Sequence, residues 1–211
     1  MKKIILTTAA VSLVLLYAFS AFAADPKGVL DAKGVYTEVN GLVKAGKLRV
    51  MQTNAPLYSA PHGVVRTVVT KFYFTESTAL DKKQTPVTGK TLRKIAVTTS
   101  YAADKPMETD EFYFDGKGRF VFYYSNADIT EEALNEHHED RYYFTGNRLV
   151  SKLVRASEEA RPLANKSAKP QKILKDANFT PDMKKYASNI LKRKDLLEDV
   201  FEKVYRAWGF I

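Results

Sequence analysis

Cysteine is absent from this chain of 211 residues, and histidine occurs only three times. Without cysteine the chain can form no disulfide framework, no thiolate nucleophile and no lipid-modified cysteine. None of the histidines lies in an H-E-x-x-H pattern, no serine lies in G-x-S-x-G, and the glycine patterns of phosphate-binding loops are missing. These absences disfavour the common classes of cysteine enzyme, zinc protease, serine hydrolase and nucleotide-binding enzyme. No cofactor is predicted.

The N-terminus has the three parts of a secretory signal. Two lysines follow the first methionine, an apolar run comes next, and an A-F-A sequence ends at Ala23. We therefore predict cleavage after Ala23 and export of residues 24–211, to the periplasm or beyond. A membrane anchor that is retained is the alternative, because the apolar run approaches spanning length. Export without disulfides suits a bacterial periplasm, and nucleic acid is not an expected partner.

The centre of the chain, within a domain at 24–155, predicts an antiparallel meander of about five or six strands. β-Branched and aromatic runs alternate with turn signals such as D-G-K-G at 115–118 and T-G-N at 145–147. Short returns of this kind join neighbouring antiparallel strands. A short strand is predicted at 48–54 and a loop at 55–63. The acidic stretch at 127–140 is predicted to be a loop or a short helix.

Helices are predicted at both ends of the exported chain, which makes the fold class α+β. Val35, Val39 and Leu42 recur at helical spacing before an A-G-K stop. A linker at 156–172, rich in Ala, Ser, Pro and Lys, precedes a helical segment at 173–211 with Thr180 as N-cap. We expect this segment to dock on the sheet or on a partner; contact with an anionic membrane surface is the alternative.

An aromatic triplet recurs in three of the predicted strands. Phe72-Tyr73-Phe74, Phe112-Tyr113-Phe114 and Tyr142-Tyr143-Phe144 each place a tyrosine between two other aromatic residues. Alternate side chains of a strand point to opposite faces, so the outer members are expected on one face and the middle tyrosines on the other. Phe120, Phe122 and Tyr124 are predicted to share one face of the returning strand.

The tyrosine face is the predicted binding surface, with helical cover over it as the alternative. Its predicted ligand-binding residues are Tyr73, Tyr113, Tyr123 and Tyr143. An aromatic face of this kind offers a large contact area at a low cost in conformational entropy. The function that we predict is a non-catalytic binding or interaction module of the cell envelope, with a glycan, peptide or protein as partner.

The stretches E-F-Y-F-D, F-V-F-Y-Y-S and R-Y-Y-F-T-G-N, set after an export signal and a helix, resemble a group of uncharacterised exported bacterial proteins. The resemblance covers about 35–154 and rests on hairpin motifs. That group has no established activity, so the resemblance implies an exported antiparallel meander and no particular chemistry.

Two alternatives involve acid–base or metal chemistry. Asp110, Glu111 and Asp115 flank a predicted turn, and a pair of carboxylates there could hydrolyse envelope carbohydrate or peptide. His137 and His138 lie next to Glu136 in an acidic stretch and are weak candidates for metal ligands. A zinc site needs three or four ligands that converge, which neighbouring residues do not readily provide. A solvated acidic segment is the favoured interpretation.

Overall fold

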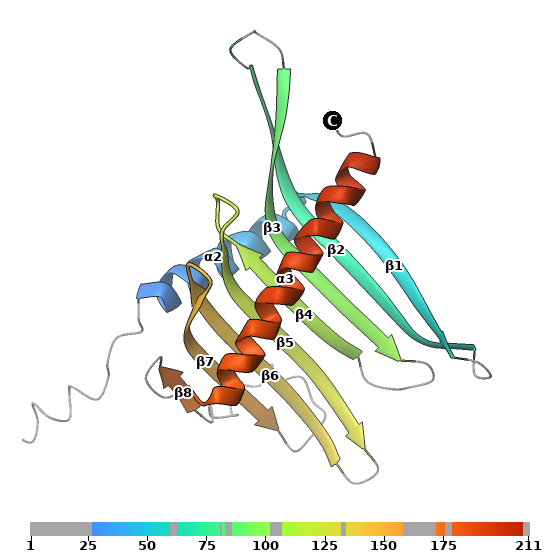
Figure 1. Cartoon of the computed structure of the whole chain (residues 1–211), viewed down its shortest axis with the longest axis vertical. Coiled ribbons are helices and arrows are strands. Elements are labelled where there is room, and N and C mark those ends of the chain that lie inside the picture. Colours follow the sequence, from blue (N-terminus) through green and yellow to red (C-terminus); the bar gives the residue numbers. More distant parts are fainter. Residues whose placement is uncertain are drawn as a thin grey trace, which may run out of the picture.

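One antiparallel sheet with a helix on each face makes up the described part of the chain (Figure 1). The computed structural model describes residues 27–59, 63–80, 82, 86–101, 107–131, 134–157, 172–175 and 179–208. The predicted signal at 1–23 and residues 158–171 of the predicted linker lie outside these residues. The α+β class predicted from the sequence is confirmed.

Within the described residues the sheet has eight strands, so the predicted number of five or six was too low. Each strand pairs antiparallel with the next in chain order: β1 (Arg49–Ser59), β2 (Gly63–Leu80), β3 (Pro86–Tyr101), β4 (Met107–Phe114), β5 (Phe120–Glu131), β6 (Leu134–Thr145), β7 (Arg148–Ser157) and the short β8 (Lys172–Lys175).

Two segments predicted as loops belong to strands instead. β1 continues through Pro56, because the missing N–H of a proline costs little in a strand at the edge of a sheet. The described residues of the acidic stretch, 127–131 and 134–140, are strand rather than loop or helix, since they extend β5 and open β6. Its residues pair across the two strands, Ala127 with His138 and Asp128 with His137. The sequence segment at 172–175, predicted within the linker and helical segment, is β8.

Helix α2 (Lys27–Lys44) covers one face of the sheet and ends at a glycine. Gly46 has a φ of 64°, which a residue without Cβ adopts at no steric cost. The amide of Gly46 donates to the carbonyl of Val43 at 3.1 Å, and that of Lys47 donates to the carbonyl of Leu42 at 2.9 Å. This pair of bonds is the Schellman arrangement, and it confirms the stop predicted at this position.

Helix α3 (Pro181–Ala207) crosses the other face (Figure 1). Thr180 caps it as predicted: its side-chain hydroxyl accepts from the amide of Met183 at 3.2 Å. Ile190, Phe201 and Tyr205 turn toward the sheet and are buried there. The helix therefore docks on its own sheet. Within the described residues, no helix is both long and apolar enough to cross a membrane.

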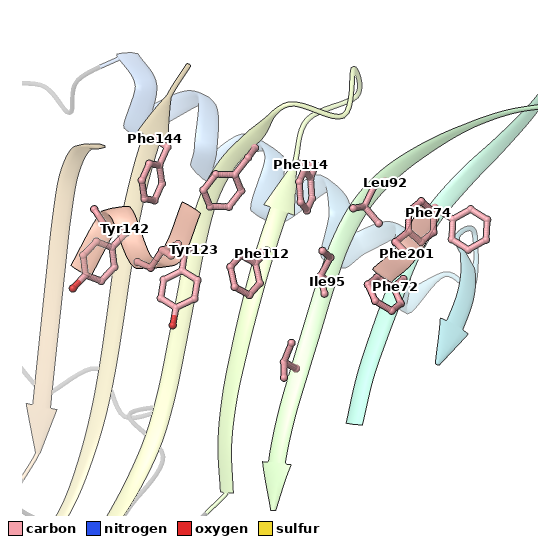
Figure 2. Packing of buried hydrophobic residues seen from close by; sticks show 14 of the residues in the cluster. Phe72, Phe74, Leu92, Ile95, Phe112, Phe114, Tyr123, Tyr142, Phe144 and Phe201 are labelled. Atoms are coloured by element: carbon pink, nitrogen blue, oxygen red, sulfur yellow. The ribbon is translucent and has the colours of Figure 1, made fainter. Parts of the chain in front are cut away.

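The aromatic triplets divide between the two faces as the alternation predicts. Their outer members, including Phe72, Phe112 and Phe144, join the buried cluster beneath α3. Their middle tyrosines lie beneath α2, where Tyr113 and Tyr143 are buried and Tyr73 is half-buried. Figure 2 shows the outer members side by side along successive strands, and the ring of Phe201 on α3 lies 5.6 Å from that of Phe72.

Each triplet faces a β-bulge in the following strand. The pairing slips by one residue after Tyr73, after Tyr113 and after Tyr143, which leaves Arg93, Val121 and Val150 as the extra residues. A bulge bends its strand and increases the local twist. Three bulges at matching positions therefore bend the sheet along one line.

The bulge at Val121 corrects the predicted orientation of β5. Phe120 lies in the cluster beneath α3, whereas Phe122 lies in the cluster beneath α2. The sequence alternation predicted these two residues on one face with Tyr124. One extra residue between them reverses the parity, because the side-chain period of a strand is two.

An ion pair between a buried carboxylate and a guanidinium that is 42% exposed joins α3 to the centre of the sheet. The guanidinium of Arg193 contacts the carboxylate of Asp110 at 2.5 Å, and the hydroxyl of Tyr123 donates to the other oxygen of that carboxylate at 2.5 Å. The side chain of Asp110 is only 2% exposed. Loss of the Asp110 charge would deprive Arg193 and the buried hydroxyl of Tyr123 of a charged hydrogen-bond acceptor.

We expect Asp110→Asn to lower the free energy of unfolding by about 2–3 kcal/mol, because it removes the charge of a buried carboxylate that is hydrogen-bonded to Tyr123 and paired with Arg193. Asp199→Asn is the matched control: Asp199 pairs with Lys203 on the same helix and its side chain is 56% exposed. The control should change stability by less than about 0.5 kcal/mol. Urea unfolding measures the stability of both variants. Equal losses of stability would contradict the role of Asp110 in holding α3 on the sheet.

Candidate functional site

The four tyrosines predicted to bind a ligand do not form one exposed row. Tyr113 and Tyr143 are buried beneath α2, and Tyr73 is half-buried beside them. Tyr123 lies on the opposite face, beneath α3, because it pairs in register with Phe112 rather than with Tyr113. The alternative considered for this face was that a helix covers it, and this describes the burial of Tyr113 and Tyr143 beneath α2.

A buried polar network holds α2 against the sheet. The hydroxyl of Tyr113 donates to Glu111 at 2.5 Å, and the ammonium of Lys94 contacts the other oxygen of the same carboxylate at 2.6 Å. Asn40 of α2 accepts from Lys94 and donates to the hydroxyl of Tyr113, both at 3.1 Å. Burial, and then the negative charge of Glu111, raise the pKa of Tyr113 well above its usual value.

Beside this network a pocket of about 270 Å³ opens between α2 and the sheet. The aromatic ring of Tyr36 forms its exposed wall, with 41% of the residue accessible. That ring rests on two aromatic residues of the sheet, 5.2 Å from the ring of Tyr113 and 5.8 Å from that of Phe122. We call this concavity the Tyr36 pocket; it is lined by Ala32, Lys33, Tyr36, Thr37, Phe122, Arg141 and Tyr143.

Arg141 supplies a fixed cation to the Tyr36 pocket. It forms an ion pair with buried Glu139, and its guanidinium carbon lies 5.9 Å from the centre of the Tyr124 ring. Burial alone would lower the pKa of Arg141, but the neighbouring Glu139 raises it, so the group stays charged. An arginine held by a carboxylate and an aromatic ring presents its remaining donors in one orientation.

The hydroxyls near the pocket act as neutral groups at ordinary pH. Burial and then the Glu111 carboxylate raise the pKa of Tyr36. Burial and then Glu139 raise the pKa of Tyr124 in the same way. Both phenols therefore keep their protons and can donate as well as accept hydrogen bonds.

The three carboxylates proposed for hydrolysis lie in separate environments. Asp110 faces α3 and pairs with Arg193, while Glu111 faces α2 and pairs with Lys94. Asp115 accepts at 2.9 Å from the amides of Lys117 and Arg119, in the turn after β4. Burial would raise the pKa of Asp115, but these bonds from Arg119 and Lys117 lower it. Neighbours in a strand point to opposite faces, so Asp110 and Glu111 do not converge on one substrate atom.

The predicted metal candidates belong to a strand. His138 is half-buried and pairs in register with Ala127, and position 137 belongs to the opposite face of β6. The side chains of Glu136 and His137 lie outside the described residues. Among the side chains that the structure describes, no three or more of His, Asp and Glu gather in a way that could hold a metal ion.

A larger cavity, of about 760 Å³, lies at the end of the sheet near the start of α2 and the middle of α3. Two of its cations already have acidic partners within its own lining: Arg119 contacts Asp115 at 2.6 Å, and Lys194 contacts Glu198 at 3.0 Å. Its aromatic floor is almost completely covered, since Phe120 is 5% exposed and Phe144 1%. It therefore offers a ligand less aromatic surface than the Tyr36 pocket does.

The sequence predicted that tyrosines gather on one face of the sheet. It did not predict that Tyr36 and Arg141 are the residues that line the pocket there. Tyr36 lies on α2 one position after Val35, which the periodicity assigned to the buried side of that helix. Arg141 directly precedes the third triplet, in a strand whose pairing was not known. Tyr36 lies four residues after buried Ala32 on the helix. This spacing could have predicted that Tyr36 lies on the side of α2 that faces the sheet.

The buried tyrosines predict a loss of stability above about pH 10. Burial raises the pKa values of Tyr113, Tyr123 and Tyr142 in the folded state, whereas the tyrosines of the unfolded chain titrate near pH 10. Above that pH the unfolded state binds fewer protons than the folded state, so the free energy of unfolding falls as the pH rises. Together the three should remove roughly 4 kcal/mol by about pH 11.

Urea unfolding at about pH 8, 10 and 11 measures this loss. Tyr123→Phe is the control, and it should reduce the loss at about pH 11 by about 1.4 kcal/mol, because the unfolded chain then has one phenol fewer to ionise. A free energy of unfolding that stays constant to about pH 11 would contradict the assignment.

Comparison of the chain with models of known protein families, with curated proteins and with solved structures gave no match. The resemblance to exported bacterial proteins therefore stays a prediction.

Proposed function

We propose that this protein is an exported, non-catalytic binding module of the cell envelope, and that it binds a sugar ring in the Tyr36 pocket. The observation that carries the proposal is the exposed ring of Tyr36, supported from below by Tyr113 and Phe122. A flat aromatic wall contacts the C–H face of a sugar, while the surrounding polar groups can bind its hydroxyls.

The polar groups of the pocket suit recognition of hydroxyls. The lining includes the hydroxyls of Thr37, Tyr36 and Tyr143 and the N–H donors of Arg141, and the Thr37 hydroxyl, which donates to the carbonyl of Lys33, can still accept. The network of Asn40, Lys94, Glu111 and Tyr113 fixes the helix that carries Tyr36. A site held in this way loses little conformational entropy when a ligand binds.

The lining of the pocket favours binding over hydrolysis. Among the described residues, the seven that line the pocket include no carboxylate and no histidine, which are the usual general acids and bases. A volume of about 270 Å³ is small for an extended peptide and suits a single ring.

Calorimetric titration of the purified protein with a panel of envelope monosaccharides and disaccharides tests the proposal. At least one sugar should bind, and Tyr36→Ala should weaken its binding about tenfold, because loss of an aromatic contact removes about 1.5 kcal/mol. Tyr186→Ala is the matched control, since Tyr186 has an equal exposure of 42% and lies on α3, across the sheet. No binding by any sugar, or an equal loss in the control, would overturn the proposal.

Export itself is a separate part of the proposal and rests on residues 1–23. When the gene is expressed in a bacterium, mass spectrometry of the periplasmic fraction should find a chain that begins at Ala24. Ala23→Phe should block cleavage, because signal peptidase requires a small residue there. Recovery of the uncleaved chain in the cytoplasm would contradict export.

A further inference from the structure

We infer that the ligand of the Tyr36 pocket is an oligosaccharide of at least two rings, and that its second ring lies against Tyr124, beyond the pocket on the same face of the sheet. This inference rests on the proposed function and names the ligand class of the same site. The pocket, of about 270 Å³, takes one ring, and Arg141 is part of its lining. The guanidinium of Arg141 also contacts the ring of Tyr124, which lies outside that lining. Arg141 therefore joins the pocket to a second aromatic residue.

Tyr124 continues the floor of the pocket along β5. The ring of Tyr36 rests on Phe122 at 5.8 Å, and Tyr124 follows Phe122 by two residues in the same strand. Two residues of a strand share a face and span roughly 7 Å, a distance of the same order as one sugar ring. Both residues belong to the cluster on the α2 face, Phe122 as a buried member and Tyr124 as a partly buried one. A glycan that leaves the pocket along β5 therefore meets Tyr124 next.

Polar side chains accompany Tyr124 on β5 and β6. Tyr124 pairs in register with Arg141, and Asn126, the next residue on that face of β5, pairs with Glu139. The amide of Asn126 donates to the hydroxyl of Tyr124 at 3.4 Å. The same amide has a second N–H and a carbonyl oxygen with which to bind sugar hydroxyls. Glu139 and Arg141 form an ion pair with each other, so these two side chains favour no charged ligand and suit a neutral glycan.

The phenols of Tyr36 and Tyr124 lie near the same charged groups, although one is on a helix and the other on a strand. Burial raises the pKa of both phenols most; Glu111 and Glu139 raise both further, and Arg141 lowers both. Because charge interactions weaken with distance, effects of the same three groups place the two phenols in one region of the surface. One short glycan can therefore contact both tyrosines.

Sugars of increasing length test the inference on the unmodified protein: glucose with cellobiose and maltose, galactose with galactobiose, and N-acetylglucosamine with chitobiose. In the series that binds, a disaccharide should bind about tenfold more tightly than its monosaccharide, because a second aromatic contact is added. A disaccharide that binds where its monosaccharide does not would give the same support. Calorimetric titration measures the ratio of the two affinities.

Variants of β5 assign this ratio to the second contact. Tyr124→Ala should reduce the ratio to about one, because the second ring loses its aromatic surface. Asn126→Ala keeps both aromatic contacts and should reduce the ratio several-fold through the lost hydrogen bonds. Tyr73→Ala is the matched control, since Tyr73 is also a half-buried tyrosine on the α2 face but lies on β2; it should leave the ratio as it is.

The outcomes separate the inference from the proposed function. If a monosaccharide binds as tightly as its disaccharides, the inference is overturned and the proposed function stands. If no sugar of any series binds, both fail. A preference for the disaccharide that persists in both Tyr124→Ala and Asn126→Ala, or that falls equally in Tyr73→Ala, would also overturn the inference.

Discussion

Burial of both faces of one aromatic sheet is the constraint on which the structure depends. Each triplet sends two large rings to one side and a tyrosine to the other, so neither face can remain open to water without a large exposed apolar patch. With no disulfide available, the two helices supply the cover. α3 takes the face dominated by phenylalanine, and α2 takes part of the face dominated by tyrosine.

The incomplete cover on the tyrosine side creates the pocket. α2 is 18 residues long, and its buried residues Val29, Ala32 and Val39 lie over the bulged end of the sheet. Beyond its edge the sheet becomes polar, with Glu111, Tyr124 and Arg141 on successive strands. The Tyr36 pocket lies at this boundary, where aromatic surface and fixed charges meet. A binding site at such a boundary can contact both sides of an amphipathic ring.

Much of the fold follows from local sequence rules. The turn residues at 115–118 and 145–147 set the hairpins, Gly46 ends α2, and Thr180 begins α3. The separation of the outer and middle triplet residues follows from the period of a strand. These features depend on residues close together in the chain, which is why the sequence alone predicts them.

The features that escaped prediction depend on pairing between strands. The three bulges are visible only when one strand is aligned with the next, and the bulge at Val121 reverses the position of Phe120. The placement of Tyr123 has the same origin, because it follows from its pairing with Phe112. Contacts between distant parts of the chain determine which face of the sheet α2 covers. They therefore also determine the exposure of Tyr36.

The large sequence separation between α3 and the strands it contacts has a consequence for folding. Helix α3 covers the phenylalanine face and is the last element described. Arg193 contacts Asp110, 83 residues earlier in the chain, and Tyr205 contacts Glu76, 129 residues earlier. Contacts between such distant residues form slowly. During synthesis the strands precede residues 181–207, so the face beneath α3 has no helical cover until that helix has been made. The docking of α3 on the phenylalanine face is therefore expected to be a late step of folding.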